Sequence, residues 1–292
     1  MGFLAGKKIC VVGGTGAFGQ AFARMTAQTH NPRRICILSR DEMKQERMAK
    51  EFPDFDYLLG DCRDRDRLKR AFWGCDVVIH AAAYKRVDSG ESDPMEVVKT
   101  NVFGSCAVVE ACLDCEVPQA IGISSDKACQ PKNLYGASKM TMEHIFRGAN
   151  VYNLGGSPVF SIVRYGNVLG STGSVIPLFL KQKAQGVLTV TDERMTRFML
   201  PMEEAVRLVW NAIEAAQPGL FLPVGLPAMK VIDIAQTIAP EAEIKIIGAR
   251  PGEKLHEVMY ENEDGTFYSS DAPARWFTPT ELNQWITSNS PQ

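Results

Sequence analysis

The chain has 292 residues, of which 45% are hydrophobic and 23% are charged. These values are typical of a globular chain with one large core, or a core and a smaller lobe, and they exclude a disordered chain. The 32 Lys and Arg residues are balanced by 34 Asp and Glu residues, so no basic excess indicates nucleic-acid binding. No run of 18 apolar residues could span a bilayer, and the first eight residues lack a signal-peptide pattern. We therefore expect a cytoplasmic protein that binds no membrane.

Eight cysteines are distributed along the chain, several of them inside apolar runs. This usage is typical of buried thiols in a reducing compartment rather than of a disulfide framework. Cys112 and Cys115 have the CxxC spacing of zinc ligands, but the sequence has no second CxxC and its four histidines form no pair. Because a structural zinc needs about four ligands, we expect no metal site.

Short apolar runs alternate with longer amphipathic stretches along the first half of the chain. The pattern predicts strands and intervening helices in this order: Lys8–Gly13, a helix to about Ala27, Arg34–Ser39, Asp41–Glu51, Tyr57–Leu59, Asp64–Phe72, Val77–Ala81, Pro94–Cys115, Gln119–Ser124, Leu134–Ala149 and Val159–Arg164. Continuously apolar strands indicate a sheet covered on both faces, and repeated crossovers indicate parallel strands. The sequence therefore predicts an α/β, doubly wound (Rossmann) fold. We expect residues 1–166 to form the cofactor-binding domain with the catalytic residues. Residues 167–292 should mainly form a smaller substrate lobe, with some chain returning to the first domain.

A glycine pattern lies at the first predicted strand-to-helix turn. Gly13, Gly16 and Gly19 have the GxxGxxG spacing, which permits a tight turn, close approach of a pyrophosphate and close helix packing. Such a pattern alone is weak evidence, but its position at this turn favours a dinucleotide, because the helix N-terminus attracts phosphates.

The end of the second predicted strand distinguishes NAD from NADP. An acidic residue there binds the ribose 2′-hydroxyl, whereas cations and hydroxyls suit a 2′-phosphate. The sequence has Ser39 and Arg40, followed by Lys44, which favours NADP over the alternative of solvated surface charges. Asp61 follows the third strand and could accept from an adenine amino group or cap the next helix, and both interpretations stay open.

Tyr135 and Lys139 form a YxxxK pattern whose spacing places both side chains on one helical face. A nearby ammonium stabilises the phenolate, so Tyr135 could accept a proton from an alcohol during hydride transfer. A YxxxK is common by chance, but here it follows a glycine turn and a strand that ends at Ser124 and Ser125. One of these two serines would lie where the reacting hydroxyl docks.

Asp126 and Lys127 follow the same strand, at the carboxyl edge where open α/β sheets place their chemistry. A hydrated loop ion pair is the alternative. A simple reductase or epimerase needs only the tyrosine and lysine, so an additional acid and base indicate further proton transfers. Elimination of water is the reaction that best fits them.

With these motifs the chain resembles the inverting UDP-N-acetylglucosamine 4,6-dehydratases, a family of extended short-chain dehydrogenase/reductases. The resemblance is carried along nearly the whole chain by the motifs GGTGAFG, SRDEMKQ, HAAAYKRV, KTNVFGS, SSDKA, YGASK, RYGNVLGSTGSVIP, TDERMTRF and RPGEKLHE. It implies a tightly bound NADP that is regenerated in each turnover, a UDP-N-acetylglucosamine or close UDP-hexosamine substrate, and a homo-oligomer.

The resemblance also implies roles for single residues. Tyr135 would deprotonate the C4 hydroxyl, Lys127 would remove the C5 proton, and Asp126 would protonate the departing C6 hydroxyl, with Ser125 and Lys139 completing the catalytic set. Related enzymes that do not invert C5 carry an Asp-Glu pair, so Lys127 indicates inversion. The implied cofactor contacts beyond those above are Thr15, Ala17, Phe18, Cys62, Ala81, Ala82, Ala83, Lys85 and Val168. The implied substrate contacts are Lys85, Asn167, Thr196, Arg197, Arg250 and Glu253.

Three positions depart from the family pattern. Val12 replaces a threonine of the glycine loop, and Tyr84 and Arg86 replace a leucine and a histidine beside the sugar site. The segment after Glu257 is shorter than in longer relatives, which leaves the oligomeric state open. A UDP-sugar 5,6-dehydratase, a 4-epimerase and, more remotely, a non-catalytic NADP-binding protein therefore remain as alternatives.

Overall fold

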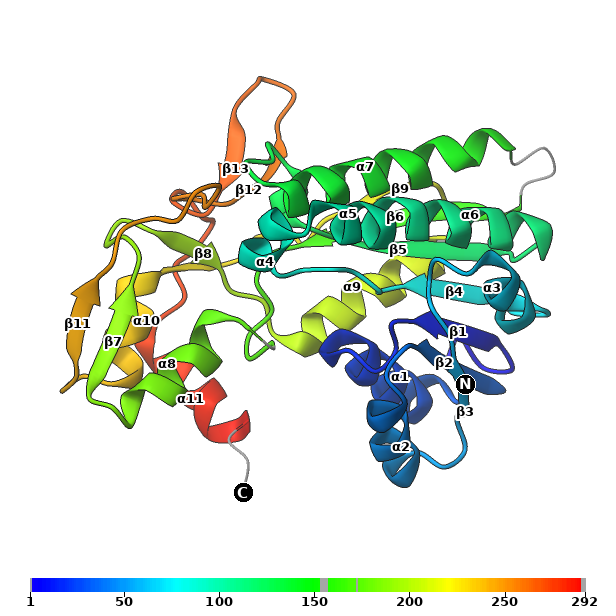
Figure 1. Cartoon of the computed structure of the whole chain (residues 1–292), viewed down its shortest axis with the longest axis horizontal. Coiled ribbons are helices and arrows are strands. Elements are labelled where there is room, and N and C mark those ends of the chain that lie inside the picture. The colour runs from blue at the N-terminus through cyan, green and yellow to red at the C-terminus, as the bar shows by residue number, and fades with distance from the viewer. Residues whose placement is uncertain (1, 153–156, 172, 290–292) are drawn as a thin grey trace. The chain divides into compact units, whose positions relative to one another are not determined.

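The computed structural model describes residues 2–152, 157–171 and 173–289, which fold as two compact units (Figure 1). The first unit comprises Met1–Arg164 and Met202–Leu222, and the second comprises Tyr165–Pro201 and Pro223–Gln292. The segment Met202–Leu222 thus leaves the second half of the chain and rejoins the first unit.

The first unit is built on a seven-stranded sheet. Its strands follow the order β3 (Asp56–Leu59), β2 (Arg34–Ser39), β1 (Lys8–Val12), β4 (Val77–His80), β5 (Gln119–Ser125), β6 (Val159–Tyr165) and β9 (Gly219–Phe221). β1 pairs in parallel with β2 on one side and with β4 on the other, with Cys10 aligned with Cys36 and Val78. All four residues of β4 are buried, as expected for a strand covered on both faces. The structure confirms the predicted doubly wound α/β fold.

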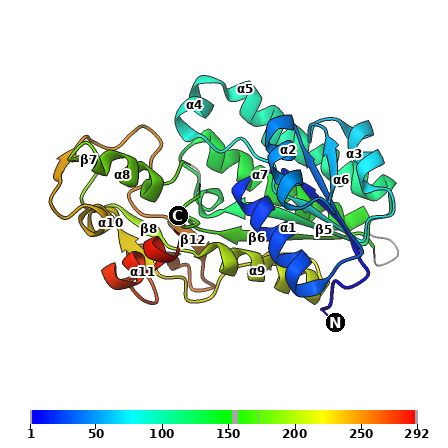
Figure 2. The ribbon, with the colours of Figure 1, turned by 90° about the horizontal axis from the view of Figure 1, so that it is seen from below.

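Helices cover both faces of this sheet. They are α1 (Ala17–His30), α2 (Glu42–Glu51), α3 (Arg65–Phe72), α4 (Val87–Ser92), α5 (Pro94–Val97), α6 (Gly104–Asp114), α7 (Leu134–Ala149) and α9 (Met202–Ala215), with 3-10 turns at Asp126–Ala128 and Asn150–Tyr152. The core beneath α3, α6 and α7 includes Phe72, Val108 and Phe146. Figure 2 shows α1 and α9 side by side, where Trp210 Nε1 donates to Thr26 Oγ1 at 2.9 Å.

The prediction of one helix over Pro94–Cys115 is only partly right. The structure divides this segment into α5, a π-helical turn over Val98–Phe103, and α6, and it adds α4, which the pattern did not predict. A π-turn accommodates one more residue than an α-turn and occurs mostly where a side chain has a special role. Helix α7, by contrast, spans the predicted residues, because Asn133 caps it by accepting from the Gly136 amide at 2.8 Å.

The second unit contains three two-stranded sheets. β7 (Val187–Val190) pairs in parallel with β11 (Glu243–Ile246), whereas β8 (Thr196–Phe198) with β10 (Ala228–Lys230) and β12 (Val258–Glu261) with β13 (Phe267–Ser269) are antiparallel. The helices are α8 (Val175–Lys183), α10 (Val231–Ile238) and α11 (Pro279–Asn289). Their apolar sides form a separate core that includes Phe179, Leu188, Ile234 and Leu282.

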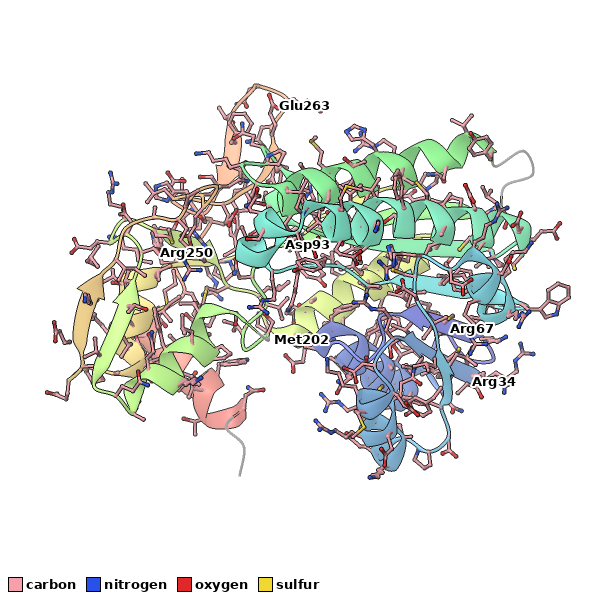
Figure 3. All side chains as sticks on the ribbon, in the orientation of Figure 1. Arg34, Arg67, Asp93, Met202, Arg250 and Glu263 are labelled. Carbon is pink, nitrogen blue, oxygen red and sulfur yellow. The ribbon has the colours of Figure 1, made fainter. Side chains whose placement is uncertain are left out.

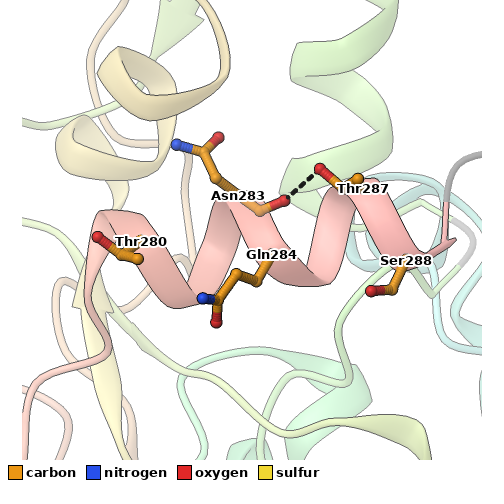
Figure 4. A pocket seen from close by; sticks show the side chains of 5 residues that line it. All are labelled: Thr280, Asn283, Gln284, Thr287 and Ser288. Atoms are coloured by element: carbon orange, nitrogen blue, oxygen red, sulfur yellow. Dashed lines mark hydrogen bonds between the residues drawn. The ribbon is translucent and has the colours of Figure 1, made fainter.

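Helix α11 has a face of exposed polar side chains, which Figure 4 shows as sticks. A hollow of about 410 Å³ on this face is lined by Thr280, Asn283, Gln284, Thr287 and Ser288, none of which is a predicted site residue. Within the part of the chain that the structure describes, no helix is both long and apolar enough to cross a membrane.

Candidate active site

A glycine-rich turn joins β1 to α1. Gly13 has a φ of +82°, and a Cβ atom there would lie 2.6 Å from the backbone nitrogen of Ala82. At Gly19 a Cβ atom would lie 2.6 Å from the Cα of Gly14. Both positions therefore exclude a side chain. At Gly16, which caps α1, an added Cβ would meet only the Gly13 carbonyl oxygen among the described residues, at 3.2 Å, so this side of the turn can admit a phosphate.

The other predicted residues of this turn surround the start of α1. The first turn of α1 carries no acidic side chain, so its amide groups can attract an anion. Thr15 is buried and its carbonyl accepts from Gln20 Nε2 at 2.7 Å. Ala17 is exposed, and Phe18 is half-buried and stacks on Phe22 with ring centroids 6.0 Å apart. The residues present fit a dinucleotide diphosphate.

The predicted 2′-phosphate residues lie at the carboxyl end of β2. Ser39 is buried and its hydroxyl accepts from Gln45 Nε2 at 3.0 Å. The Arg40 side chain is 60% exposed, and its Nη1 lies 3.6 Å from Asp61 Oδ2. Lys44 Nζ lies 3.0 Å from Asp41, whose carboxylate also accepts from the Lys44 amide. Asp41 thus offsets the positive charge of Lys44 in the first turn of α2. Of the two predicted cations, Arg40 is therefore more available to a ligand than Lys44.

Asp61 is engaged by arginines. Arg63 Nη2 lies 2.8 Å from its Oδ2, and Arg63 also donates its amide and Nε to Oδ1. Burial raises the pKa of the Asp61 carboxyl, but the hydrogen bonds from Arg63 and the charge of Arg40 outweigh this and leave the pKa below its usual value. The alternative interpretation of Asp61 as a helix cap is wrong, because Asp64 caps α3 by accepting from Arg67. The next residue, Cys62, is buried and would contact any Cβ added at Gly104.

The loop after β4 carries Ala81, Ala82 and Ala83, all partly buried, and the exposed Lys85. Ala81 and Ala82 face the tight turn at Gly13, since their backbone atoms are the nearest neighbours of its missing Cβ. The loop therefore borders the same turn that the glycine pattern forms.

Asn101 holds this loop to α7, and the sequence interpretation missed its role. It lies in the π-helical turn, is 1% exposed, and its Oδ1 accepts from the Tyr84 amide at 2.7 Å. Its Nδ2 donates to the Tyr84 carbonyl at 3.0 Å and to Ser138 Oγ at 2.8 Å. A polar amide inside an otherwise apolar helical pattern was the available signal, because a buried side chain of this kind needs several partners.

Tyr135 and Lys139 lie one turn apart on α7. Lys139 is 4% exposed, and burial lowers its pKa to about 8 against the opposing charge of Glu143. Its charge in turn contributes to the low pKa of His80, about 3, whose main cause is burial. The helix therefore presents a partly buried phenol together with an amine whose affinity for a proton is lowered by burial.

Asp126 and Lys127 form a 3-10 turn directly after β5. Asp126 is 0% exposed, and Lys127 Nζ lies 3.0 Å from its Oδ1. Ser125 donates its hydroxyl to the same oxygen at 2.9 Å and caps the turn by accepting from the Lys127 amide at 3.3 Å. The structure thus brings Ser125, Asp126 and Lys127 into one hydrogen-bonded group, and this turn packs against α7. The CxxC cysteines lie elsewhere, at the end of α6, where Cys115 caps the helix.

Ser124 and Ser125, which the sequence left as alternatives, have different surroundings. Ser124 is 3% exposed and donates its hydroxyl to Glu143 Oε1 at 2.5 Å. Ser125 is partly exposed beside Asp126. Ser125 is therefore the serine that a substrate hydroxyl could reach.

The predicted substrate residues of the second unit form their own group. Arg197, 8% exposed, lies 3.5 Å from Glu253 Oε1 and 3.8 Å from Glu257. The Arg250 amide donates to Glu253 Oε2 at 3.3 Å, and the Arg250 side chain is exposed in the loop between β11 and β12 (Figure 3). Thr196 is buried, with its hydroxyl within 2.8 Å of both His256 Nδ1 and Ser270 Oγ.

Asn167 and Val168 follow β6 in the second unit. Asn167 is half-buried, and its side-chain oxygen has no hydrogen-bond partner among the described residues. Its carbonyl accepts from the Leu200 amide at 3.0 Å, and Val168 forms a parallel bridge with Leu200. A buried acceptor without a partner costs free energy, so a donor on a bound ligand could satisfy Asn167.

The amino-acid sequence is similar to those of known proteins over most of its length. Polysaccharide biosynthesis proteins match residues 9–273. The chain belongs to this family. A UDP-N-acetylglucosamine 4,6-dehydratase (inverting) of Campylobacter jejuni subsp. jejuni serotype O:23/36 (strain 81-176) is 45% identical over 266 residues, covering 89% of this chain and 79% of the relative. A UDP-glucose 4-epimerase of Rickettsia conorii is 38% identical over 268 residues, covering 88% and 79%. The predicted resemblance is thereby confirmed.

Several solved protein structures share the fold of this chain. The X-ray structure of Pen from Bacillus thuringiensis has 32% sequence identity and a TM-score of 0.91, covering 98% of this chain and 100% of that one. DesIV, a dTDP-glucose 4,6-dehydratase from Streptomyces venezuelae solved with NAD and TYD bound, has 20% identity and a TM-score of 0.75, covering 85% and 86%. In DesIV, therefore, the same fold holds a nicotinamide dinucleotide.

Proposed function

We propose that the protein is a UDP-N-acetylglucosamine 4,6-dehydratase that inverts C5 and releases a UDP-4-keto-6-deoxy-L-arabino-hexosamine. The observation that carries the proposal is the contact of 3.0 Å between Lys127 Nζ and the fully buried Asp126, in a turn packed against the helix of Tyr135 and Lys139. An epimerase has no use for this second acid and base. The similarity to an inverting dehydratase of Campylobacter jejuni supports the same reaction.

The cofactor that we propose is NADP, held by the Gly13–Gly19 turn and by Arg40. Bound there, the nicotinamide would accept the C4 hydride of the sugar and return a hydride to C6, so it would be regenerated in each turnover. Arg40 supports NADP because its largely exposed guanidinium, at the end of β2, can pair with a 2′-phosphate. Ala81 to Ala83 and Lys85 would line the adjoining surface.

Tyr135 would take the proton of the C4 hydroxyl while Lys139 stabilises the phenolate. The ammonium of Lys139 is suited to this role because it is buried and its charge is therefore screened little by water. The ketone formed at C4 makes the neighbouring C5 hydrogen acidic. Ser125, partly exposed beside Asp126, would hold the reacting hydroxyl in place.

Elimination requires Lys127 as a neutral amine and Asp126 as a neutral acid, although each is charged in an ordinary ion pair. The hydrogen bond between them provides a route, because one proton passing from Lys127 to Asp126 produces both forms at once. Lys127 would then remove the C5 proton while Asp126 protonates the leaving C6 hydroxyl. Water departs, and the two side chains regain their resting charges. As hydride returns to C6, a proton would add to C5 from the face opposite to the one that lost its proton, which inverts this centre.

The second unit would bind the uridine diphosphate. Arg197 and Arg250 are suited to the phosphates, and Glu253, which contacts both residues, is suited to ribose hydroxyls. The side-chain oxygen of Asn167 would accept a donor from the substrate, and Thr196 would support Arg197 from its buried position. We further propose a cytoplasmic homo-oligomer, which light scattering on the purified protein would test.

The test is incubation of the purified protein with UDP-N-acetylglucosamine and NADP in deuterated water, followed by NMR. A C6 methyl group together with deuterium at an inverted C5 is the expected result. A retained C6 hydroxymethyl with an altered C4 would indicate a 4-epimerase instead, and a released 5,6-alkene would indicate a 5,6-dehydratase. Tight NADP binding without turnover would indicate a non-catalytic protein.

A further inference from the structure

A buried ion pair lies close to the proposed catalytic residues and takes no part in the proposed proton transfers. Glu143 on α7 accepts from Arg164 Nε at 2.8 Å through Oε1 and from Nη2 at 2.5 Å through Oε2. Glu143 is 3% and Arg164 8% exposed, and Ser124 donates to Glu143 as well. Burying two charges costs free energy before they interact, and an apolar pair would fill the same volume. Packing alone therefore does not explain why Glu143 and Arg164 are buried here.

Glu143 acts on Lys139 from one helical turn away. The spacing Tyr135, Lys139, Glu143 places all three side chains on one face of α7. Burial lowers the pKa of Lys139 to about 8, and Glu143 is the leading group that opposes this effect. Without the carboxylate, the Lys139 ammonium would lose its proton at a lower pH.

Arg164 acts on Asp126, whose turn lies next to the ion pair because Ser124, two residues before Asp126, donates to Glu143 at 2.5 Å. Burial lowers the pKa of the Arg164 guanidinium, but Glu143 raises it more, with smaller contributions in the same direction from Cys129 and Asp126. By reciprocity, a positive Arg164 favours the ionised form of Asp126. Asp126, however, must hold a proton before it can act as an acid. Glu143 neutralises the charge of Arg164 and so removes this opposition.

We propose that Glu143 and Arg164 are positioning residues that set the proton affinities of the catalytic group, Glu143 by keeping Lys139 protonated and the neutralised pair by letting Asp126 accept the proton of Lys127. The inference rests on the proposed dehydration for the second part. Other titratable groups of the described residues also lie near Lys139: Tyr135 one turn away on α7, Asp126 and Lys127 in the turn packed on this helix, His80 on β4 and Cys62 after β3. His80 has a pKa of about 3 and Cys62 one of about 12, so both stay neutral between pH 6 and 9 and neither can replace the charge of Glu143 beside Lys139.

The first experiment titrates Lys139 and needs no turnover. Protein labelled with ¹³C at the lysine ε carbon is followed by NMR from pH 6 to 10, and the Lys139 signal is assigned with Lys139→Met. We expect Glu143→Gln to lower the titration midpoint by at least about one pH unit, and Arg164→Met, which leaves Glu143 unneutralised, to raise it. Midpoints that stay in place, or that move in the same direction in both variants, would overturn the proposal.

The second experiment follows the chemistry in single turnovers. In Glu143→Gln the unneutralised Arg164 should hold Asp126 ionised, so elimination slows by about tenfold or more and reduced cofactor accumulates at 340 nm. The double variant Glu143→Gln/Arg164→Met has a neutral pair, so elimination should recover while the Lys139 midpoint stays low. Slow elimination in the double variant would refute the role of Arg164.

Ser124→Ala is the matched control, because it removes a hydrogen bond to Glu143 without changing any charge. It should lower stability and leave the Lys139 midpoint in place, whereas a shifted midpoint would assign the effect to packing. Glu143→Asp keeps the charge and should keep the midpoint, which provides a test if Glu143→Gln folds poorly. Failure of the wild-type protein to form a C6 methyl would refute the proposed function alone, since the titration stands without it.

Discussion

The proposed chemistry and the proposed recognition are built differently in the two units. In the first unit Asp126, Lys139 and Glu143 are at most 4% exposed and lie on α7 or in the turn between β5 and α7. In the second unit the Arg250 side chain is exposed and that of Glu253 is 26% exposed, on a loop between short strands. Charges withheld from water interact strongly, whereas exposed charges are screened. Substitutions in the first group should therefore change kcat, and those in the second mainly KM.

The largest effect is expected from Lys127→Ala and Tyr135→Phe. Each removes a proton-transfer group from the first unit, so formation of the C6 methyl should fall by about 10²- to 10⁴-fold, with little change in KM. Product NMR and initial rates measure both quantities. A loss confined to KM would assign these residues to binding and would erase the contrast between the units.

The two variants should also differ from each other. Tyr135→Phe should block the transient rise in reduced cofactor, because oxidation at C4 comes first. Lys127→Ala should let that rise occur and stop at the 4-ketone. The same block in both variants would mean that Lys127 acts before elimination.

In the second unit, Arg250→Ala should raise KM by about 10- to 100-fold with kcat nearly unchanged, since a charge-assisted hydrogen bond to a phosphate is lost. Arg275→Ala is the matched control, because Arg275 is an exposed arginine of the same unit that pairs with Glu281 at 2.8 Å. Its KM should stay at the wild-type value. Equal effects of the two substitutions would indicate only a general loss of positive charge.

A smaller effect is expected at the edge of the first unit. Arg40→Ala should lower the preference for NADP over NAD by about tenfold, because a single exposed guanidinium contributes modestly in water. Lys44→Ala should change the preference less, since Asp41 already pairs with Lys44. Dissociation constants for both cofactors provide the measurement. An unchanged ratio in both variants would remove the support for NADP.

The sequence predicted the first unit well where local signals agree with tertiary packing. Helix α7 has an asparagine cap and apolar residues at helical spacing, so its bounds and the positions of Tyr135 and Lys139 could be read directly. The role of Asn101 was missed, because its buried side-chain amide bonds to Tyr84 and Ser138. Both partners lie far from Asn101 in the sequence, so no local pattern indicates the π-turn. The Glu143–Arg164 pair was missed for the same reason, since its two residues belong to different elements.

The second unit could not be predicted in this way. Its strands have three or four residues each, too short for a period of two to be distinguished from chance. Arg197 and Glu253 were found only through the family resemblance, and their contact at 3.5 Å depends on how β8 meets the loop before β12. Short elements held by tertiary contacts leave little local signal.

The stability of the buried first unit should also be sensitive to pH. His80 is 1% exposed, its Nε2 lies 3.1 Å from Ser105 Oγ, and burial followed by the charge of Lys139 lowers its pKa to about 3. Below pH 6.5 the unfolded chain therefore binds a proton that the folded chain does not, and stability is lost as the pH falls. His80 should contribute a slope of about 1.4 kcal/mol per pH unit to the free energy of unfolding between pH 6 and 5. Urea denaturation of His80→Phe should show a curve flatter by this amount, whereas replacement of the exposed His144 by asparagine should leave the slope unchanged. Equal slopes in His80→Phe and wild type would mean that His80 gains a proton in the folded protein. The low pKa assigned to His80 would then be wrong.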